Sequence, residues 1–148
     1  LRRELHRLIV RTVEPADHSA WVAMRVRLWP DEDPEELAGE LADIRETVFV
    51  AEADGALIGF IEIGVRSYAG GGPVRPSPYV EGIWVEPEHP SRGVARAMLD
   101  AAERWSRSQG FTHLGSDALL DNELSRAWHK AAGFAEIERI VVFGKPLD

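Results

Sequence analysis

The most informative part of the 148-residue chain is Ile83-Trp84-Val85-Glu86-Pro87-Glu88-His89-Pro90-Ser91-Arg92-Gly93-Val94-Ala95. An apolar run leads into a proline-containing loop, so the stretch predicts a strand, a tight loop and the start of a helix. Helix N-termini offer free backbone N–H groups to anions, and Gly93 and Ala95 allow close approach to the main chain. Arg92 and Arg96 add positive charge. These residues predict a phosphate-binding loop; the alternative is that small residues begin the helix only for packing.

The rest of the chain predicts strands and helices in mixed order. Apolar residues at helical spacing indicate helices, and short alternating or continuous apolar runs between turn residues indicate strands. An Asp-Gly pair at 54–55 predicts a tight hairpin, and Gly82 predicts a bulge. Strands are expected at 9–13, 47–52, 57–65, 79–85 and 112–116, with one or two closing strands at 134–145, and helices at 17–29, 33–44, 94–110 and 122–132. The pattern predicts one mixed α/β (α+β) domain at 9–148, preceded by an N-terminal extension at 1–8.

The composition limits the classes of function. No apolar run resembles a membrane span or a secretory signal, so a cytoplasmic location is expected. The absence of cysteine excludes disulfides, thiolate zinc sites and a cysteine nucleophile, but says little about the redox compartment. The five histidines show no metal-ligand spacing, so no metal is expected. A net charge of −8 argues against nucleic acid and fits a cationic partner, although many soluble proteins are equally acidic.

Glu81 is the strongest candidate for a functional carboxylate. By strand alternation it shares a face with Tyr79, Ile83 and Val85, so it places a charge on an apolar face beside the predicted phosphate loop. Burying a carboxylate without a partner is costly, which favours a functional role. Asp117 follows the next predicted strand, where it is either a second functional carboxylate or an ordinary turn residue.

Other candidates also have ordinary structural interpretations. The acidic run 31–36 either forms a solvated helix start or attracts a molecule with several ammonium groups. His129 lies two helical turns after Asn122, so both are expected on one side of their helix, unless His129 is simply exposed. Taken singly, Trp29 is more often a packing residue, and Tyr68 is more often an exposed residue on a loop.

Two motifs resemble those of the GNAT acetyltransferases. The segment 90–95 is similar to their acetyl-CoA pyrophosphate loop, Arg/Gln-x-x-Gly-x-Gly/Ala, but Pro90 replaces the first residue. The segment 122–134, Asn-x-x-Ser-x-x-x-His-x-x-x-Gly-Phe, resembles their second cofactor motif, with His129 at the usual tyrosine position. The resemblance implies a GNAT fold, with a largely antiparallel sheet whose strands splay at the acetyl-CoA site between 79–85 and 112–116.

Within the GNAT acetyltransferases, the sequence most resembles the aminoglycoside 6'-N-acetyltransferases. It is carried by Leu28-Trp29-Pro30, Arg66-x-Tyr68, Glu81-Gly82-Ile83, Arg92-Gly93-Val94-Ala95, Ser116-Asp117 and the pattern from Asn122 to Phe134. The resemblance implies an acidic acceptor site lined by Trp29, Tyr68, Glu81 and Asp117. It implies acetyl-CoA binding by Ile83, Val85, Arg92, Gly93, Val94, Ala95, Arg96, Asn122 and His129.

The expected reaction is direct acetyl transfer to a primary amine, namely the 6'-amine of an aminoglycoside. Glu81 or Asp117 would remove a proton from the acceptor, a strand backbone N–H would polarise the thioester, and His129 would protonate the leaving thiolate. The resemblance also implies a homodimer. The alternatives are acetylation of another small amine or a protein N-terminus, and a CoA-binding sensor without turnover.

Overall fold

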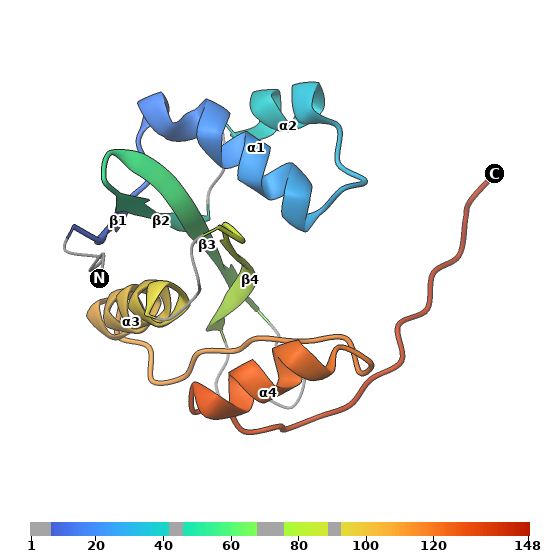
Figure 1. The fold of residues 1–148 in the computed structure, drawn as a ribbon. Coiled ribbons are helices and arrows are strands. Elements are labelled where there is room, and N and C mark those ends of the chain that lie inside the picture. The colour runs from blue at the N-terminus through green and yellow to red at the C-terminus, as the bar shows by residue number, and fades with distance from the viewer. Residues whose placement is uncertain (1–6, 42–45, 68–75, 89–92) are drawn as a thin grey trace.

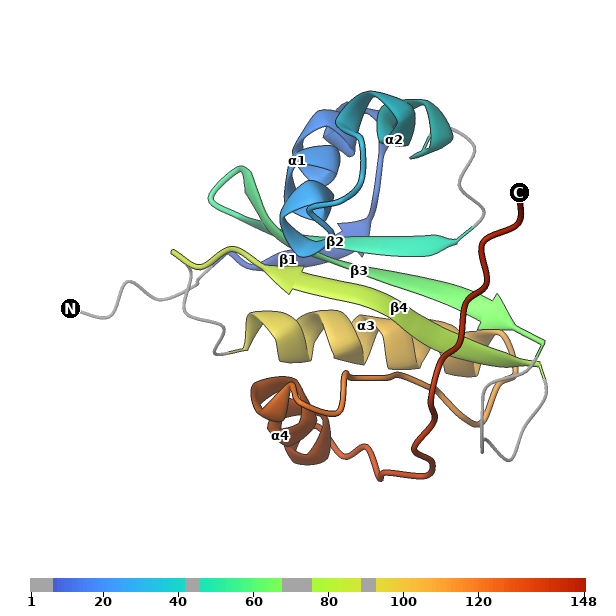
Figure 2. The ribbon, with the colours of Figure 1, turned by 90° about the vertical axis from the view of Figure 1, so that its right-hand side faces the viewer.

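The computed structural model describes residues 7–41, 46–67, 76–88 and 93–148. Its centre is a four-stranded antiparallel sheet in the order β1-β2-β3-β4, with strands Ile9–Thr12, Thr47–Ala53, Ala56–Arg66 and Ser77–Val85. A 3₁₀ helix, η1, and four α-helices accompany the sheet: η1 Pro15–Asp17, α1 His18–Leu28, α2 Pro34–Leu41, α3 Val94–Ser108 and α4 Glu123–Ala131. The helices α1 and α2 cover one face of the sheet, and α3 covers the other, with α4 beyond it (Figures 1 and 2). The predicted mixed α/β architecture is confirmed.

Turn and capping residues explain most element boundaries. Asp54 and Gly55 adopt φ angles of 51° and 82°, the positive values that the predicted hairpin between β2 and β3 requires. Asp33 caps α2 by accepting from the Glu35 and Glu36 amides at 2.8 and 3.4 Å. Asp17 precedes α1 as expected, but its carboxylate does not cap the helix; it forms a two-point ion pair with Arg11 instead.

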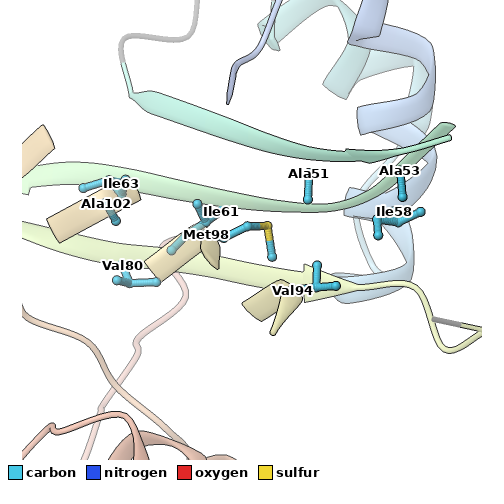
Figure 3. Close-up of a cluster of buried hydrophobic side chains, with 9 residues drawn as sticks. All are labelled: Ala51, Ala53, Ile58, Ile61, Ile63, Val80, Val94, Met98 and Ala102. Carbon is cyan, nitrogen blue, oxygen red and sulfur yellow. The ribbon is translucent and has the colours of Figure 1, made fainter. Parts of the chain in front are cut away.

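Each face of the sheet has its own hydrophobic core. On the α3 face, Met98 and Ala102 pack against Ile61, Ile63 and other apolar residues (Figure 3). On the α1 face, the buried core consists of Trp21, Met24, Leu37, Val48, Val50 and Phe60. The side chains of β3 and β4 therefore point into two different cores, one on each face of the sheet.

A bulge in β4 changes which residues share a face. Glu62 pairs with Gly82 but Ile63 pairs with Val80, so Glu81 is an extra residue in β4. The bulge that Gly82 predicts is therefore present. Its consequence contradicts strict alternation: Ile83 and Val85 pack in the α3 core, whereas Glu81 lies on the α1 side. The prediction that Glu81 shares a face with Ile83 and Val85 is wrong for this reason.

The C-terminal third also differs from expectation. The segment 112–116 contributes only a single parallel bridge, Gly115 to Tyr79. Residues 134–148 are extended and form no strand, so the prediction of closing strands at 134–145 is wrong for this structure. Backbone groups of an extended segment need a partner strand, and none among the described residues pairs with this one. Its exposed apolar side chains are Ile137, Ile140, Val141, Val142, Phe143 and Leu147.

None of the helices in the described ranges is long and apolar enough to span a membrane. Most of the expected N-terminal extension, residues 1–6, lies outside the described residues.

Candidate active site

An acidic cleft of about 410 Å³ opens between the α1–α2 connection and strands β3 and β4. Most of its polar lining is carboxylate. The lining residues are Arg25, Leu28, Trp29, Pro30, Asp31, Glu32, Glu46, Glu62 and Glu81. Five of these nine residues are acidic, which makes the cleft suited to a cation.

Trp29 is positioned by the end of α1 and by Gly82. It is the C-cap residue of α1, with the helix ending before Pro30 as expected. A Cβ added at Gly82 would lie 2.4 Å from Trp29 Cη2, so only glycine at the bulge lets the indole lie across β4. The predicted Trp29 and Glu81 therefore line the same cleft.

The cleft floor contains a buried carboxylate that sequence reasoning missed. Glu62 on β3 is fully buried, and its Oε1 receives a hydrogen bond from Trp21 Nε1 at 3.1 Å and lies 3.3 Å from Arg25 Nη1. Its Oε2 has no hydrogen-bond partner among the described residues. Burial raises the pKa of Glu62 to about 7, against the lowering effect of Arg25. Burial, together with Glu81, also raises the pKa of the neighbouring Glu46.

Glu81 and Asp117 are held by two neighbouring side chains. Arg66 donates to Glu81 twice, from Nε to Oε1 at 2.9 Å and from Nη2 to Oε2 at 2.6 Å. The Tyr79 hydroxyl donates to Asp117 Oδ2 at 2.7 Å, and the Arg66 guanidinium carbon lies 3.6 Å from the Tyr79 ring centre. Burial and the bond to Asp117 raise the pKa of Tyr79, so its phenol remains a donor at neutral pH. The two predicted carboxylates thus belong to one network.

His129 on α4 contacts the segment that carries Asp117. Its Nε2 lies 2.7 Å from Ser116 Oγ, and its Nδ1 lies 2.7 Å from the backbone oxygen of Ser125. A carbonyl oxygen only accepts, so the neutral ring carries its proton on Nδ1 and accepts from the Ser116 hydroxyl through Nε2. His129 is therefore an oriented side chain adjoining the predicted site.

The predicted phosphate site lies at the N-terminus of α3. Gly93 has a φ of 90°, a left-handed conformation that favours glycine. The Ala97 amide donates to the Gly93 carbonyl at 2.9 Å, so the amides before Ala97 precede the first hydrogen bond of the helix. Among the described residues, no heavy atom lies within 4 Å of the place a Gly93 Cβ would take. No described residue therefore covers Gly93 on the side of its missing Cβ.

Val94 and Ala95, in the first turn, have buried side chains. Only their main chain is therefore available to a bound anion. Two other predicted cofactor residues make contacts within the protein. Arg96 pairs with Asp100 at 3.1 Å, and Asn122 caps α4 by accepting from the Ser125 amide at 3.1 Å.

The open edge of β4 lies between these groups. The Val80 amide donates to the Gly115 carbonyl, and the Gly115 amide donates to the Pro78 carbonyl. No backbone hydrogen bond among the described residues joins 81–85 to 112–116. Strand β4 and the segment after 115 therefore separate beyond this contact, as the expected splay requires.

The structure gathers Trp29, Glu81, Asp117 and His129 around β4 and residues 115–117. Tyr68 and Arg92 lie outside the described residues. No cluster of three metal-ligating side chains occurs within the described ranges. A smaller cavity of about 270 Å³, between the end of α3 and residues 132–134, contains none of the predicted site residues.

Comparison with known proteins identifies the class. The model of the Acetyltransferase (GNAT) family matches residues 13–134, and the chain belongs to this family. Within it, the chain is 42% identical over 143 residues to aminoglycoside N(6')-acetyltransferase type 1 of Stenotrophomonas maltophilia, covering 94% of each chain. The narrower resemblance found in the sequence is thereby confirmed.

Two solved structures extend the comparison to bound ligands. The aminoglycoside N-acetyltransferase AAC(6')-Iy in complex with CoA has a TM-score of 0.91 at 30% identity, with 99% of both chains covered. AAC(6')-Iy in complex with the bisubstrate analogue CoA-S-monomethyl-acetylneamine has a TM-score of 0.87 at 30% identity, covering 95% of this chain and 99% of the other.

Proposed function

We propose that the chain transfers the acetyl group of acetyl-CoA directly to the 6'-amine of aminoglycosides. The observation that carries the proposal is the acidic cleft beside the open edge of β4. The cleft lies on the α1 side of the sheet and α3 packs on the other face, so the sheet separates a site suited to a polyamine from a helix N-terminus suited to a pyrophosphate. The named relatives act on, or are bound to, molecules of these two kinds.

The acceptor half of the reaction belongs to Trp29, Glu81 and Asp117. Ammonium groups form charge-assisted hydrogen bonds with carboxylates, worth roughly 1.5–3 kcal/mol each, and the indole provides an apolar wall. Glu81 lines the cleft, and Asp117 is connected to Glu81 through Tyr79 and Arg66. Before attack the ammonium must lose a proton, which either carboxylate accepts directly or through a water. Tyr68 would complete this half.

The donor half belongs to the α3 N-terminus and the edge of β4. The main chain at 93–95 would hold the pyrophosphate, with Arg92 and Arg96 adding charge, because Pro90 offers no side-chain donor. A backbone N–H of β4 at Ile83 or Val85 would polarise the thioester, and Asn122 would line the pantetheine side. Acetyl-CoA supplies the activated acyl group, and holding the amine against it contributes roughly 7–11 kcal/mol in well-oriented cases.

Product analysis tests this function. The protein is incubated with acetyl-CoA and an aminoglycoside that carries a 6'-amine; release of CoA and an acetyl group located at the 6'-nitrogen by fragmentation mass spectrometry are expected. An otherwise similar aminoglycoside with a 6'-hydroxyl is the matched control and should remain unmodified. Faster turnover of peptide N-termini or simple monoamines would favour the alternative acetyltransferases, and binding of CoA without turnover of any amine would favour a sensor.

The carboxylate roles are tested by changing charge while keeping shape. Glu81→Gln and Asp117→Asn should each lower kcat/KM for aminoglycosides by roughly 10- to 100-fold, the equivalent of one charge-assisted hydrogen bond, while acetyl-CoA affinity stays nearly constant. Wild-type acceptor affinity should fall as salt rises. Wild-type efficiency in both variants would exclude the assigned acceptor site.

We infer further that the protein is a homodimer assembled through residues 134–148. Six large apolar side chains in this segment are between 55% and 89% exposed. An extended segment with unpaired backbone groups is a template for pairing with another chain. A second copy is the proposed occupant, because both partners would then bury the same apolar segment in an isologous contact.

Sedimentation analysis tests the assembly. The wild-type chain should sediment as a dimer, and Val142→Asp with Phe143→Asp should shift it to a monomer at the same concentration. A wild-type monomer at micromolar concentration would contradict the inference.

The proposed location is the cytoplasm, and the proposed consequence for a host cell is aminoglycoside resistance. Expression of the chain in a susceptible bacterium should raise the inhibitory concentration of 6'-amino compounds but not of their 6'-hydroxyl counterparts. Fractionation of the same cells should recover the protein with cytosolic markers; recovery in the membrane fraction would contradict the location.

A further inference from the structure

We propose that Arg66 is a positioning residue of the acceptor site and fixes the placement of the Glu81 and Asp117 carboxylates relative to each other. The inference rests on the proposed function, which assigns those two carboxylates to the acceptor amine. Arg66 was part of the sequence resemblance, yet neither that resemblance nor the relatives' names give it a role.

The first step is the contact between Arg66 and Glu81. Two hydrogen bonds of 2.9 and 2.6 Å join the guanidinium to both carboxylate oxygens. A planar guanidinium fixes the orientation of a carboxylate, which a lysine ammonium does not, because its charge is a single point. Each carboxylate oxygen retains a further lone pair, so the pair leaves Glu81 able to accept from an amine.

The second step is the contact between Arg66 and Tyr79. The guanidinium carbon lies 3.6 Å from the ring centre, within the range of a cation–π contact. The hydroxyl of the same ring donates to Asp117 at 2.7 Å. One guanidinium therefore touches one carboxylate directly and orients the phenol that holds the other.

Two glycines provide the space for this network. At Gly64 an added Cβ would lie 2.9 Å from Glu81 Oε1, and at Gly115 it would lie 2.7 Å from the Tyr79 ring. Both positions are buried. The backbone on either side is thus shaped to receive these side chains, which an incidental surface ion pair does not require.

The bulge explains why such support is needed. Glu81 is the unpaired extra residue of β4, so the sheet ladder constrains its backbone less than that of its neighbours. Contacts made by its side chain must therefore contribute to its orientation. A displacement of about 1 Å at a reacting group can lower the rate roughly 100-fold, which makes the orientation functionally significant.

A double-mutant cycle tests the proposal through kcat/KM for a 6'-amino aminoglycoside. Arg66→Met should lower kcat/KM about 10- to 100-fold in the wild-type background and by a smaller factor in Glu81→Gln, because only the indirect contact with Asp117 through Tyr79 is then left to lose. Arg66→Lys keeps the charge and should recover only part of the loss. Tyr79→Phe should lower kcat/KM in the wild-type background and have little further effect in Asp117→Asn.

Arg11→Met is the matched control, because Arg11 forms an equally short two-point pair with Asp17 away from the cleft. It should leave kcat/KM of the folded protein unchanged. The proposal would be overturned if Arg66→Met lowered kcat/KM by the same factor in the wild-type and Glu81→Gln backgrounds. Full recovery of kcat/KM by Arg66→Lys would also overturn it. A wild-type protein that acetylates no aminoglycoside would instead contradict the proposed function.

Discussion

Replacing the buried Glu62 by glutamine should change how stability depends on pH. In the folded protein, burial raises the pKa of Glu62 to about 7, from 4.5 for an ordinary glutamate. The folded state therefore binds this proton more tightly than the unfolded state. Its stabilising contribution is complete below about pH 4.5 and is lost as the pH rises through 7.

The size of the effect follows from the same two values. Between pH 5 and pH 8 the wild-type chain should lose about 2–3 kcal/mol of unfolding free energy from this group, at roughly 1.4 kcal/mol for each tenfold change in proton affinity. Glutamine keeps the shape but does not titrate. The difference in unfolding free energy, Glu62→Gln minus wild type, should therefore become more positive by that amount over this interval.

Urea denaturation at pH 5 and pH 8 measures this difference. Glu35→Gln, the same substitution at an exposed position on α2, is the control and should follow the wild-type pH dependence. A constant difference between Glu62→Gln and wild type would refute the reasoning, because it would mean that Glu62 binds its proton equally in the folded and unfolded states.

Three further predictions concern binding and turnover. Gly93→Val should weaken acetyl-CoA binding in calorimetry at least tenfold, because the side chain blocks close approach of the pyrophosphate to the main chain. Gly93→Asn should also weaken binding, although asparagine tolerates the left-handed conformation. Unchanged affinity in both variants would exclude this loop as the pyrophosphate site. His129→Phe should lower kcat more than it weakens CoA binding, because it removes the side chain expected to protonate the leaving thiolate. If the variant were as active as the wild type across the pH range, His129 would have only a structural role. Gly82→Ala should raise the acceptor KM with little change in acetyl-CoA affinity, because the added Cβ would lie 2.4 Å from Trp29 Cη2 and displace the indole. An unchanged acceptor KM would mean that Trp29 does not contact the acceptor.

Local sequence patterns predicted the elements well where one residue type determines the backbone. The hairpin at Asp54 and Gly55, the cap at Asp33 and the end of α1 before Pro30 all depend on neighbours in sequence. The extended segment 134–145 was different, because a strand exists only when a second segment pairs with it. Sequence periodicity carries no information about that partner.

The candidate site shows the same difference between features set by neighbouring residues and features set by distant partners. Glu81 and Asp117 were predicted from their positions at strands, but their partners Arg66 and Tyr79 depend on the register between β3 and β4. Glu62 had a signal that was missed, since it interrupts an apolar strand just as Glu81 does. Its partners on α1 could not be inferred, because the packing of a helix on a sheet is set by the whole core.

The extra residue in β4 separates two kinds of evolutionary change. At the bulge the strand presents Glu81 to the acidic cleft, whereas Val80, Ile83 and Val85 pack in the α3 core on the other side. Substitutions that alter the choice of acceptor can therefore accumulate on one side without disturbing the layer that supports the helix at the donor site. A lineage carrying this strand can acquire new drug preferences while its way of holding the acyl donor stays constant.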